Sequence, residues 1–248
     1  MINQFRQRLV SCMLLIMFLS LTFACQFFSF GREEEISNKE AYYAIDPNTI
    51  LDSLAQGATN VFTPQIATPE FESSIQGEPV EWSQSDYFRI ADALHEFVWN
   101  ESLDEWNLDG MTFGMDCKDV DYGSQYANFR FYKVVHTREK ESRLVHNIYI
   151  FPAENSVWWT EIEYYPKLAN WGSLDQKQIK VSVNDALQIA ETNGGRKARL
   201  EVNNKCKFAA IIPIWEYEGW NLTYTSDAKL FNINIDPLTG EYRIISSN

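Results

Sequence analysis

Two cysteines outside the N-terminal apolar segment are the first residues whose chemistry has a structural consequence. Four cysteines are present; Cys12 and Cys25 lie in or directly after that segment, and Cys117 and Cys206 lie in the region with folded patterns. In an oxidising compartment two such thiols tend to pair. We therefore expect a Cys117–Cys206 disulfide, which stabilises the fold by about 4 kcal/mol on closing a loop of roughly 90 residues. Two buried free thiols are the alternative, because spacing alone does not place the Cα atoms within bridging distance.

The other polar residues show no catalytic or metal-binding spacing. His95, His136 and His146 are scattered, without the spacing of a zinc site, and the chain has no nucleophile elbow and no glycine-rich phosphate loop. We expect no metal and no cofactor. Glu161 and Glu163 alternate on one face of a predicted strand, which leaves an acid-based hydrolase as the less favoured alternative. The expectation is a protein that is not an enzyme.

An aromatic group near the middle of the chain offers a candidate binding surface. If Trp158 and every second residue along its predicted strand face a helix, then Trp159 and Tyr165 point outward. Trp171 follows in the connector after this strand. Large exposed aromatic side chains often mark contact surfaces. In the alternative, a second layer or the connector covers these rings.

Composition narrows the class of partner. Apolar residues make up 45% of the 248-residue chain and aromatic residues 15%, enough for a packed core rich in flat side chains. Acidic residues outnumber basic ones 34 to 21, giving a net charge of −13. Nucleic-acid binding needs clustered lysine and arginine. We therefore expect no nucleic-acid partner.

The first 25 residues have the layout of an export signal. Arg6 and Arg8 precede an uncharged apolar run over Leu9–Ala24, the pattern of a bacterial leader. Leu21–Cys25 resembles a lipobox, in which the cysteine is lipidated and becomes the mature N-terminus. Cys25 is the expected lipidation site.

An uncleaved membrane helix is the alternative for the same segment. The apolar run continues to Phe30, so Leu9–Phe30 is long enough to span a bilayer, with the basic end inside. Either arrangement, lipid or helix, tethers the folded part to the membrane on its outer side.

Residues 26–84 read as a flexible spacer. Gly31–Glu40 is charged and has no apolar face. Prolines at positions 64, 69 and 79 interrupt any long helix or strand. We expect a tether that holds the folded part away from the membrane.

Residues 85–166 predict a first folded unit. Apolar residues at helical spacing follow Ser83 and Ser85, either of which can cap the helix, and His95 falls on its polar side. Four period-two stretches follow, at about 111–117, 127–131, 144–151 and 157–165. One helix on a four-stranded sheet is the expected arrangement.

Residues 167–248 predict a second unit of the same kind. Ser182 and Asp185 form a capping box for a helix over Val183–Ala190, which we expect to stop at Gly194–Gly195. Alternating stretches predict strands at 198–202, 211–224, 231–235 and 242–245. The turn Asp236-Pro-Leu-Thr-Gly240 joins the last two as a hairpin.

Three pieces of this second unit resemble a PepSY-type domain: Ser182–Ala190, Gly219–Tyr224 and Phe231–Tyr242. The resemblance covers about residues 180–247. It implies a cystatin-like α+β layer, found in secreted or membrane-anchored proteins, some of which inhibit or chaperone peptidases.

The sequence therefore predicts an α+β protein with two tandem cystatin-like units, each one helix packed on an antiparallel sheet of three to four strands. Its expected role is that of a membrane-tethered, extracytoplasmic, non-enzymatic protein that binds a protein or peptide through a sheet face or edge. A structural subunit of an envelope complex is the alternative.

Overall fold

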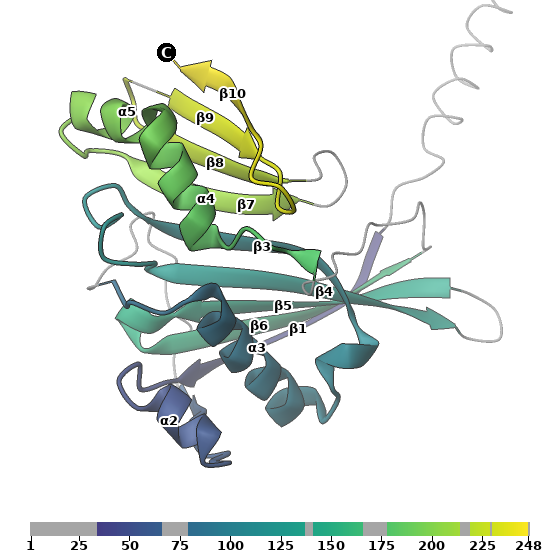
Figure 1. Ribbon diagram of the computed structural model, residues 1–248. Helices are drawn as coiled ribbons and strands as arrows, with labels where there is room; N and C mark the ends of the chain where they lie inside the picture. Colours follow the sequence, from purple (N-terminus) through teal and green to yellow (C-terminus); the bar gives the residue numbers. More distant parts are fainter. Residues whose placement is uncertain are drawn as a thin grey trace, which may run out of the picture.

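Ten strands form one continuous antiparallel sheet in the part of the chain that the computed structural model describes, residues 34–65, 79–136, 141–165, 178–213, 219–228 and 230–247. The strand order is β10-β9-β8-β7-β3-β4-β5-β6-β1-β2 (Figure 1). The strands are β1 (Glu34–Ala44), β2 (Thr63–Pro64), β3 (Asn107–Asp116), β4 (Tyr126–His136), β5 (Glu141–Phe151), β6 (Ser156–Tyr165), β7 (Lys207–Pro213), β8 (Trp220–Thr225), β9 (Leu230–Ile235) and β10 (Tyr242–Ser247).

The single sheet corrects the prediction of two tandem cystatin-like units. β3 pairs with β7 from Gly110 opposite Pro213 to Asp116 opposite Lys207, so strands from both halves share one hydrogen-bonded ladder. If the halves had separate sheets, β3 and β7 would each leave a row of unpaired backbone groups at an edge. The pairing removes both edges, and the predicted boundary near residue 166 does not divide the sheet.

Helices cover one face of this sheet. α3 (Gln84–Trp99) lies over β4, β5 and β6, and α4 (Val183–Ala190) lies over β7 and β8 (Figure 1). Both begin at a capping box, Ser83 with Asp86 and Ser182 with Asp185, which confirms the predicted helix starts. Beneath them the core is continuous across the junction, because the Phe113 ring lies 5.9 Å from Phe129 and 6.2 Å from Trp220. Two shorter elements complete this layer, α2 (Ile50–Ala55) and a 3-10 turn at Leu103–Glu105.

The second helix ends at the glycine pair, as predicted, but another helix follows it directly. Asn193 and Gly194 have non-helical dihedrals, and Gly194 takes a positive φ of 126°. Gly195 returns to helical dihedrals, with φ −57°, and α5 (Arg196–Glu201) follows where the sequence predicts a strand. The segment Glu191–Gly195 is therefore a kink at which two helices meet.

β1 lies within the segment predicted as a flexible spacer. It pairs with β6 along almost its whole length, from Glu34 opposite Tyr165 to Ala44 opposite Ser156, with one irregularity. Its charged residues are compatible with a strand because most of their side chains stay exposed. The prediction of a flexible spacer over residues 26–84 is therefore wrong for Glu34–Ala44.

The C-terminal hairpin confirms its prediction. Gly240 has a φ of 77°, and its amide donates to the Asp236 carbonyl at 2.9 Å. Among the described residues no helix is long and apolar enough to cross a bilayer. The apolar run Leu9–Phe30 lies outside them.

Candidate functional site

Two histidines meet in the core at the C-terminal end of α3. His95 from α3 and His146 from β5 are 0% and 1% exposed, and His95 Nε2 lies 3.0 Å from His146 Nδ1. The His146 ring lies between two indoles, with ring centroids 3.8 Å from Trp99 and 3.9 Å from Trp106. Together with Glu161 on β6, these four residues form what we call the histidine cluster.

Hydrogen-bond partners assign the protons of both neutral rings. The backbone carbonyl of Glu101 can only accept, so His95 Nδ1 donates to it at 2.9 Å. His95 Nε2 then accepts from His146 Nδ1. This leaves His146 Nε2 without a proton, 3.4 Å from Glu161 Oε2. Among the described residues, no group donates a hydrogen bond to this nitrogen.

Burial keeps both imidazoles neutral at neutral pH. Burial lowers the pKa of His146 to about 2, with smaller contributions from positive charge on His95, Lys39 and Lys133. Burial also lowers the pKa of His95, against the opposing effect of its hydrogen bond to Glu101. A neutral imidazole between indoles avoids the cost of an enclosed charge.

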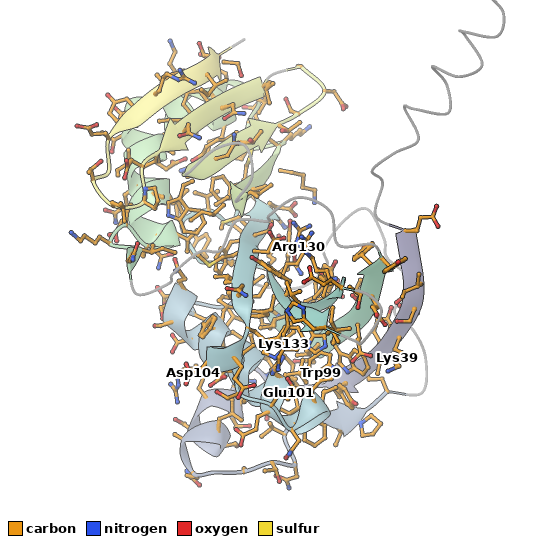
Figure 2. All side chains as sticks on the ribbon, turned by 90° about the vertical axis from the view of Figure 1, so that its right-hand side faces the viewer. Lys39, Trp99, Glu101, Asp104, Arg130 and Lys133 are labelled. Carbon is orange, nitrogen blue, oxygen red and sulfur yellow. A yellow bond between two sulfur atoms is a disulfide. The ribbon has the colours of Figure 1, made fainter. Side chains whose placement is uncertain are left out.

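Charged groups surround the histidine cluster at the protein surface. Glu161 accepts from Lys39 Nζ at 2.5 Å and from Trp99 Nε1 at 2.7 Å. Glu101 accepts from Trp106 Nε1 at 2.9 Å and pairs with Lys133 at 3.3 Å. Figure 2 shows Trp99, Glu101 and Lys133 grouped near the end of α3, with Lys39 on β1 to one side. Because both oxygens of Glu161 already accept hydrogen bonds, this carboxylate is placed to hold structure together.

The sequence prediction placed His95 on the polar side of its helix, and this is wrong. His95 faces the sheet, because Ala91, His95 and Trp99 follow one another at intervals of four on a single face of α3. That spacing was the signal available in the sequence. The pairing of His95 with His146, 51 residues apart, has no such signal.

The predicted aromatic binding surface is only partly present. Trp159 is 9% exposed and packs edge-on against Trp99, with centroids 4.9 Å apart, so it belongs to the core. The prediction assigned the side chains of β6 to the wrong faces of the sheet. Val157 and Trp159 face α3, and Trp158 lies on the other face beside Tyr149. Tyr165, at the end of the strand, is 37% exposed. Trp171 lies outside the described residues.

The Cys117–Cys206 disulfide is confirmed, with Cα atoms 5.3 Å apart. It joins the end of β3 to the turn before β7, and the Cys117 amide also donates to the Cys206 carbonyl at 2.9 Å. Cys25 lies outside the described residues, so its lipidation stays a prediction. Those residues contain no group of three or more histidine, cysteine, aspartate or glutamate side chains placed to bind a metal ion.

A cleft of about 730 Å³ opens between the start of α3, the loop joining β3 to β4, and the bent helix α4–α5. We call it the helix cleft. Its charged and aromatic lining includes Glu81, Trp82, Asp86, Asp121, Tyr122, Arg196 and Arg199.

A buried ion pair forms one wall of the helix cleft. Arg199 is 5% exposed and donates from Nε to Glu191 Oε2 at 2.9 Å and from Nη1 to Asn204 at 3.0 Å. Tyr224 donates to the other oxygen of Glu191 at 2.7 Å. Burial raises the pKa of Tyr224, and the Glu191 charge raises it further, so the phenol keeps its proton. The kink between α4 and α5 brings Glu191 and Arg199 together.

The edge of the sheet formed by β10 is a third candidate surface. β10 pairs with β9 on one side and ends the strand order on the other. Tyr242, Ile244 and Ile245 are 49%, 45% and 45% exposed. Two features limit further pairing at this edge, the charged residue Arg243 and an irregularity in the pairing with β9 between Ile244 and Ser246.

Comparisons with known proteins leave the family open. No family model matches the sequence, and no curated protein matches it. A structure described as a putative lipoprotein from Clostridium difficile 630 is 12% identical, covering 70% of this chain and 95% of that one, with a TM-score of 0.38. A MaoC-like dehydratase from Phytophthora capsici is 10% identical, covering 86% and 93%, with a TM-score of 0.18. Both scores are too low to indicate fold or function, and the PepSY likeness stays one of sequence pattern.

Proposed function

We propose that this protein is a membrane-tethered, extracytoplasmic, non-enzymatic binding protein that takes an extended segment of a partner protein along the free edge of β10. The disulfide supports a location outside the cytoplasm, because such bonds persist in oxidising compartments. The basic, apolar leader with its lipobox-like end supports the tether. The PepSY-like pattern supports a peptidase-modulating role as one form of this binding.

The observation that carries the proposal is the exposure of β10. An edge strand displays unpaired backbone donors and acceptors, and an added strand obtains affinity from them and specificity from neighbouring side chains. Tyr242 and Ile244 pair with Ile235 and Ile233, whose side chains are fully buried under the helix layer. The two β10 residues therefore extend the apolar surface beyond what the helices cover.

Charge selects the kind of segment. Arg243 is the one charged residue of β10, so a strand that alternates apolar and acidic residues complements this edge. The occupant we commit to is an acidic, β-forming peptide segment of another protein.

The test uses the full-length chain in detergent micelles and a short synthetic peptide that alternates valine and glutamate. We expect the peptide to slow hydrogen exchange of backbone amides in β10, as measured by NMR. A matched peptide with prolines in place of the valines should leave exchange unchanged, since proline has no amide proton to pair.

A charge reversal identifies the site. Arg243→Glu should weaken peptide binding by about tenfold, the effect of losing roughly 1.4 kcal/mol. Lys118→Glu, at an exposed lysine far from the edge, is the matched control and should bind as the unaltered chain does. Protection that appears away from β10, or sedimentation showing that the chain pairs with itself through this edge, would refute the proposal.

A further inference from the structure

We infer that the helix cleft binds a small zwitterion of the amino-acid class, either a free amino acid or a very short peptide. The inference is independent of the β10 edge, because the cleft lies over the middle of the sheet between the two helices. Its volume of about 730 Å³ falls within the range of small-molecule sites.

The cleft is held open by bonds that need no ligand. The loop between β3 and β4 is fixed at its start by the Cys117–Cys206 disulfide and farther along by Asp121, which faces Arg199. Across the cleft, the Gln84 side chain accepts from the Val183 amide at 2.9 Å and so links the starts of the two helices. A site that is already formed avoids the cost of ordering its walls on binding.

The arginine wall suits a carboxylate. Asp121 holds both its oxygens 3.4 Å from Arg199 Nη2, longer than an ordinary charged hydrogen bond, on a side chain that is 67% exposed. Arg199 Nη2 also pairs with Glu191 Oε2 at 2.9 Å, so this guanidinium is already occupied and acts on a ligand as a fixed positive charge. Arg196 lines the same wall, is exposed, and makes no ion pair with any residue the structure describes. Arg196 therefore offers its guanidinium to a ligand carboxylate, beside the fixed charge of Arg199.

The opposite wall suits an ammonium group. Glu81 and Asp86, from the start of α3 and the segment before it, line the cleft beside the Trp82 ring. Tyr122, 64% exposed, lies on the neighbouring loop. Carboxylates and aromatic faces together attract organic cations. A simple anion or a simple cation would meet like charge on one wall, whereas a zwitterion is matched on both.

The experiment is isothermal titration of the full-length chain in detergent micelles with a panel of amino acids and dipeptides. Each active compound is compared with its methyl ester, which lacks the carboxylate charge, and with its deaminated analogue, which lacks the ammonium group. We expect binding of the parent compound and at least about tenfold weaker binding of both analogues. Preference for dipeptides over amino acids would assign the ligand to peptide ends.

Variants tie the binding to the cleft. Arg196→Ala should weaken binding by at least about tenfold, and Glu81→Gln should weaken the parent compound more than its deaminated analogue. Lys197→Ala is the matched control, because Lys197 is a neighbouring exposed cation, paired with Glu201 at 3.9 Å. Unchanged thermal unfolding of each variant shows that it is folded. The inference is overturned if no member of the panel binds, if either analogue binds as tightly as its parent, or if Arg196→Ala has no effect.

Discussion

The histidine cluster shows how much a few side chains constrain this fold. His146 lies between two indoles and has one hydrogen bond to another histidine, so its environment accepts a neutral ring. In an unfolded chain the same ring takes up a proton near pH 6.5, the ordinary pKa of histidine. Folding therefore depends on both histidines giving up their protons.

The first prediction concerns acid sensitivity. Because burial lowers the pKa values of His95 and His146 in the folded state, the unfolded chain binds more protons as pH falls through about 6.5, and stability falls with it. Between about pH 7.5 and about pH 5.5 the His146 ring alone should cost about 1.4 kcal/mol of unfolding free energy, and the His95 ring should add to this loss, as measured by urea denaturation.

The charged groups that face the cluster, Glu161, Glu101, Lys39 and Lys133, stay in place when the histidines are replaced. A doubly substituted chain, His95→Asn with His146→Asn, should therefore lose most of this pH dependence, whatever its absolute stability. His136→Gln, at an exposed histidine, should retain it. Equal slopes for all three chains would contradict the assignment to the buried pair.

The second prediction separates packing from binding at β6. Trp159→Ala removes a 9% exposed indole that packs on Trp99, so it should lower the free energy of unfolding by about 3 to 5 kcal/mol. Tyr165→Ala, at the exposed end of the same strand, should cost less than about 1 kcal/mol. Chemical denaturation of both variants provides the comparison. A small effect at Trp159 would show that its ring does not contribute to the core.

At the scale of elements, the bent helix α4–α5 depends on glycine for a steric reason. A Cβ added at Gly195 would lie 2.8 Å from the Tyr224 ring and 2.9 Å from the Ala190 carbonyl oxygen. Such distances force the ring or the helix to move. The kink that aligns Glu191 with Tyr224 and Arg199 therefore requires the missing side chain.

The third prediction follows from this contact. Gly195→Ala should lower the free energy of unfolding by about 1 to 2 kcal/mol, since overpacking exceeds the gain in helix propensity. Lys197→Ala, in the same helix but exposed, should be nearly neutral. Thermal unfolding followed by circular dichroism measures both. A more stable Gly195→Ala chain would show that the segment relaxes to an ordinary α-helix.

Local signals predicted some elements well and others poorly. Ser83, Ser182 and the Asp236–Gly240 turn act through neighbours a few residues away, so their capping boxes and hairpin were visible in the sequence. α5 was missed because Ala198, Leu200 and Val202 alternate like a strand, although a second helix begins directly after the kink at Gly194. β1 was missed because its stabilising partner is a strand more than a hundred residues away.

At the scale of the whole molecule, the β3–β7 pairing makes one sheet of two similar halves. Nothing in either strand alone specifies this partner, because each would also fit as the edge of a smaller sheet. The candidate sites share this property. The histidine cluster draws on α3, β5 and β6, and the helix cleft on both helices and a loop, so their residue types were visible but their proximity was not.

The fourth prediction tests the covalent link between the halves. Replacing Cys117 and Cys206 together by serine should lower the free energy of unfolding by about 4 kcal/mol, because the unfolded chain regains the freedom of the opened loop. Denaturation in urea with and without a reducing agent is the measurement. The reducing agent should destabilise the original chain and leave the double variant unchanged. A small loss would mean that the β3–β7 ladder and the shared core hold the halves together without the covalent link.

The place of β1 in the sheet also determines when the fold can be completed. Lys39 and Glu161, which pair across β1 and β6, are 122 residues apart in the chain. The strand that is synthesised first must therefore wait for a partner that is made much later. Closing so long a loop is entropically costly and slows folding. We expect a nascent chain to expose the edge of β6 and the Glu161 side of the histidine cluster until β1 pairs with β6. During that period a strand of a chaperone could occupy the same edge.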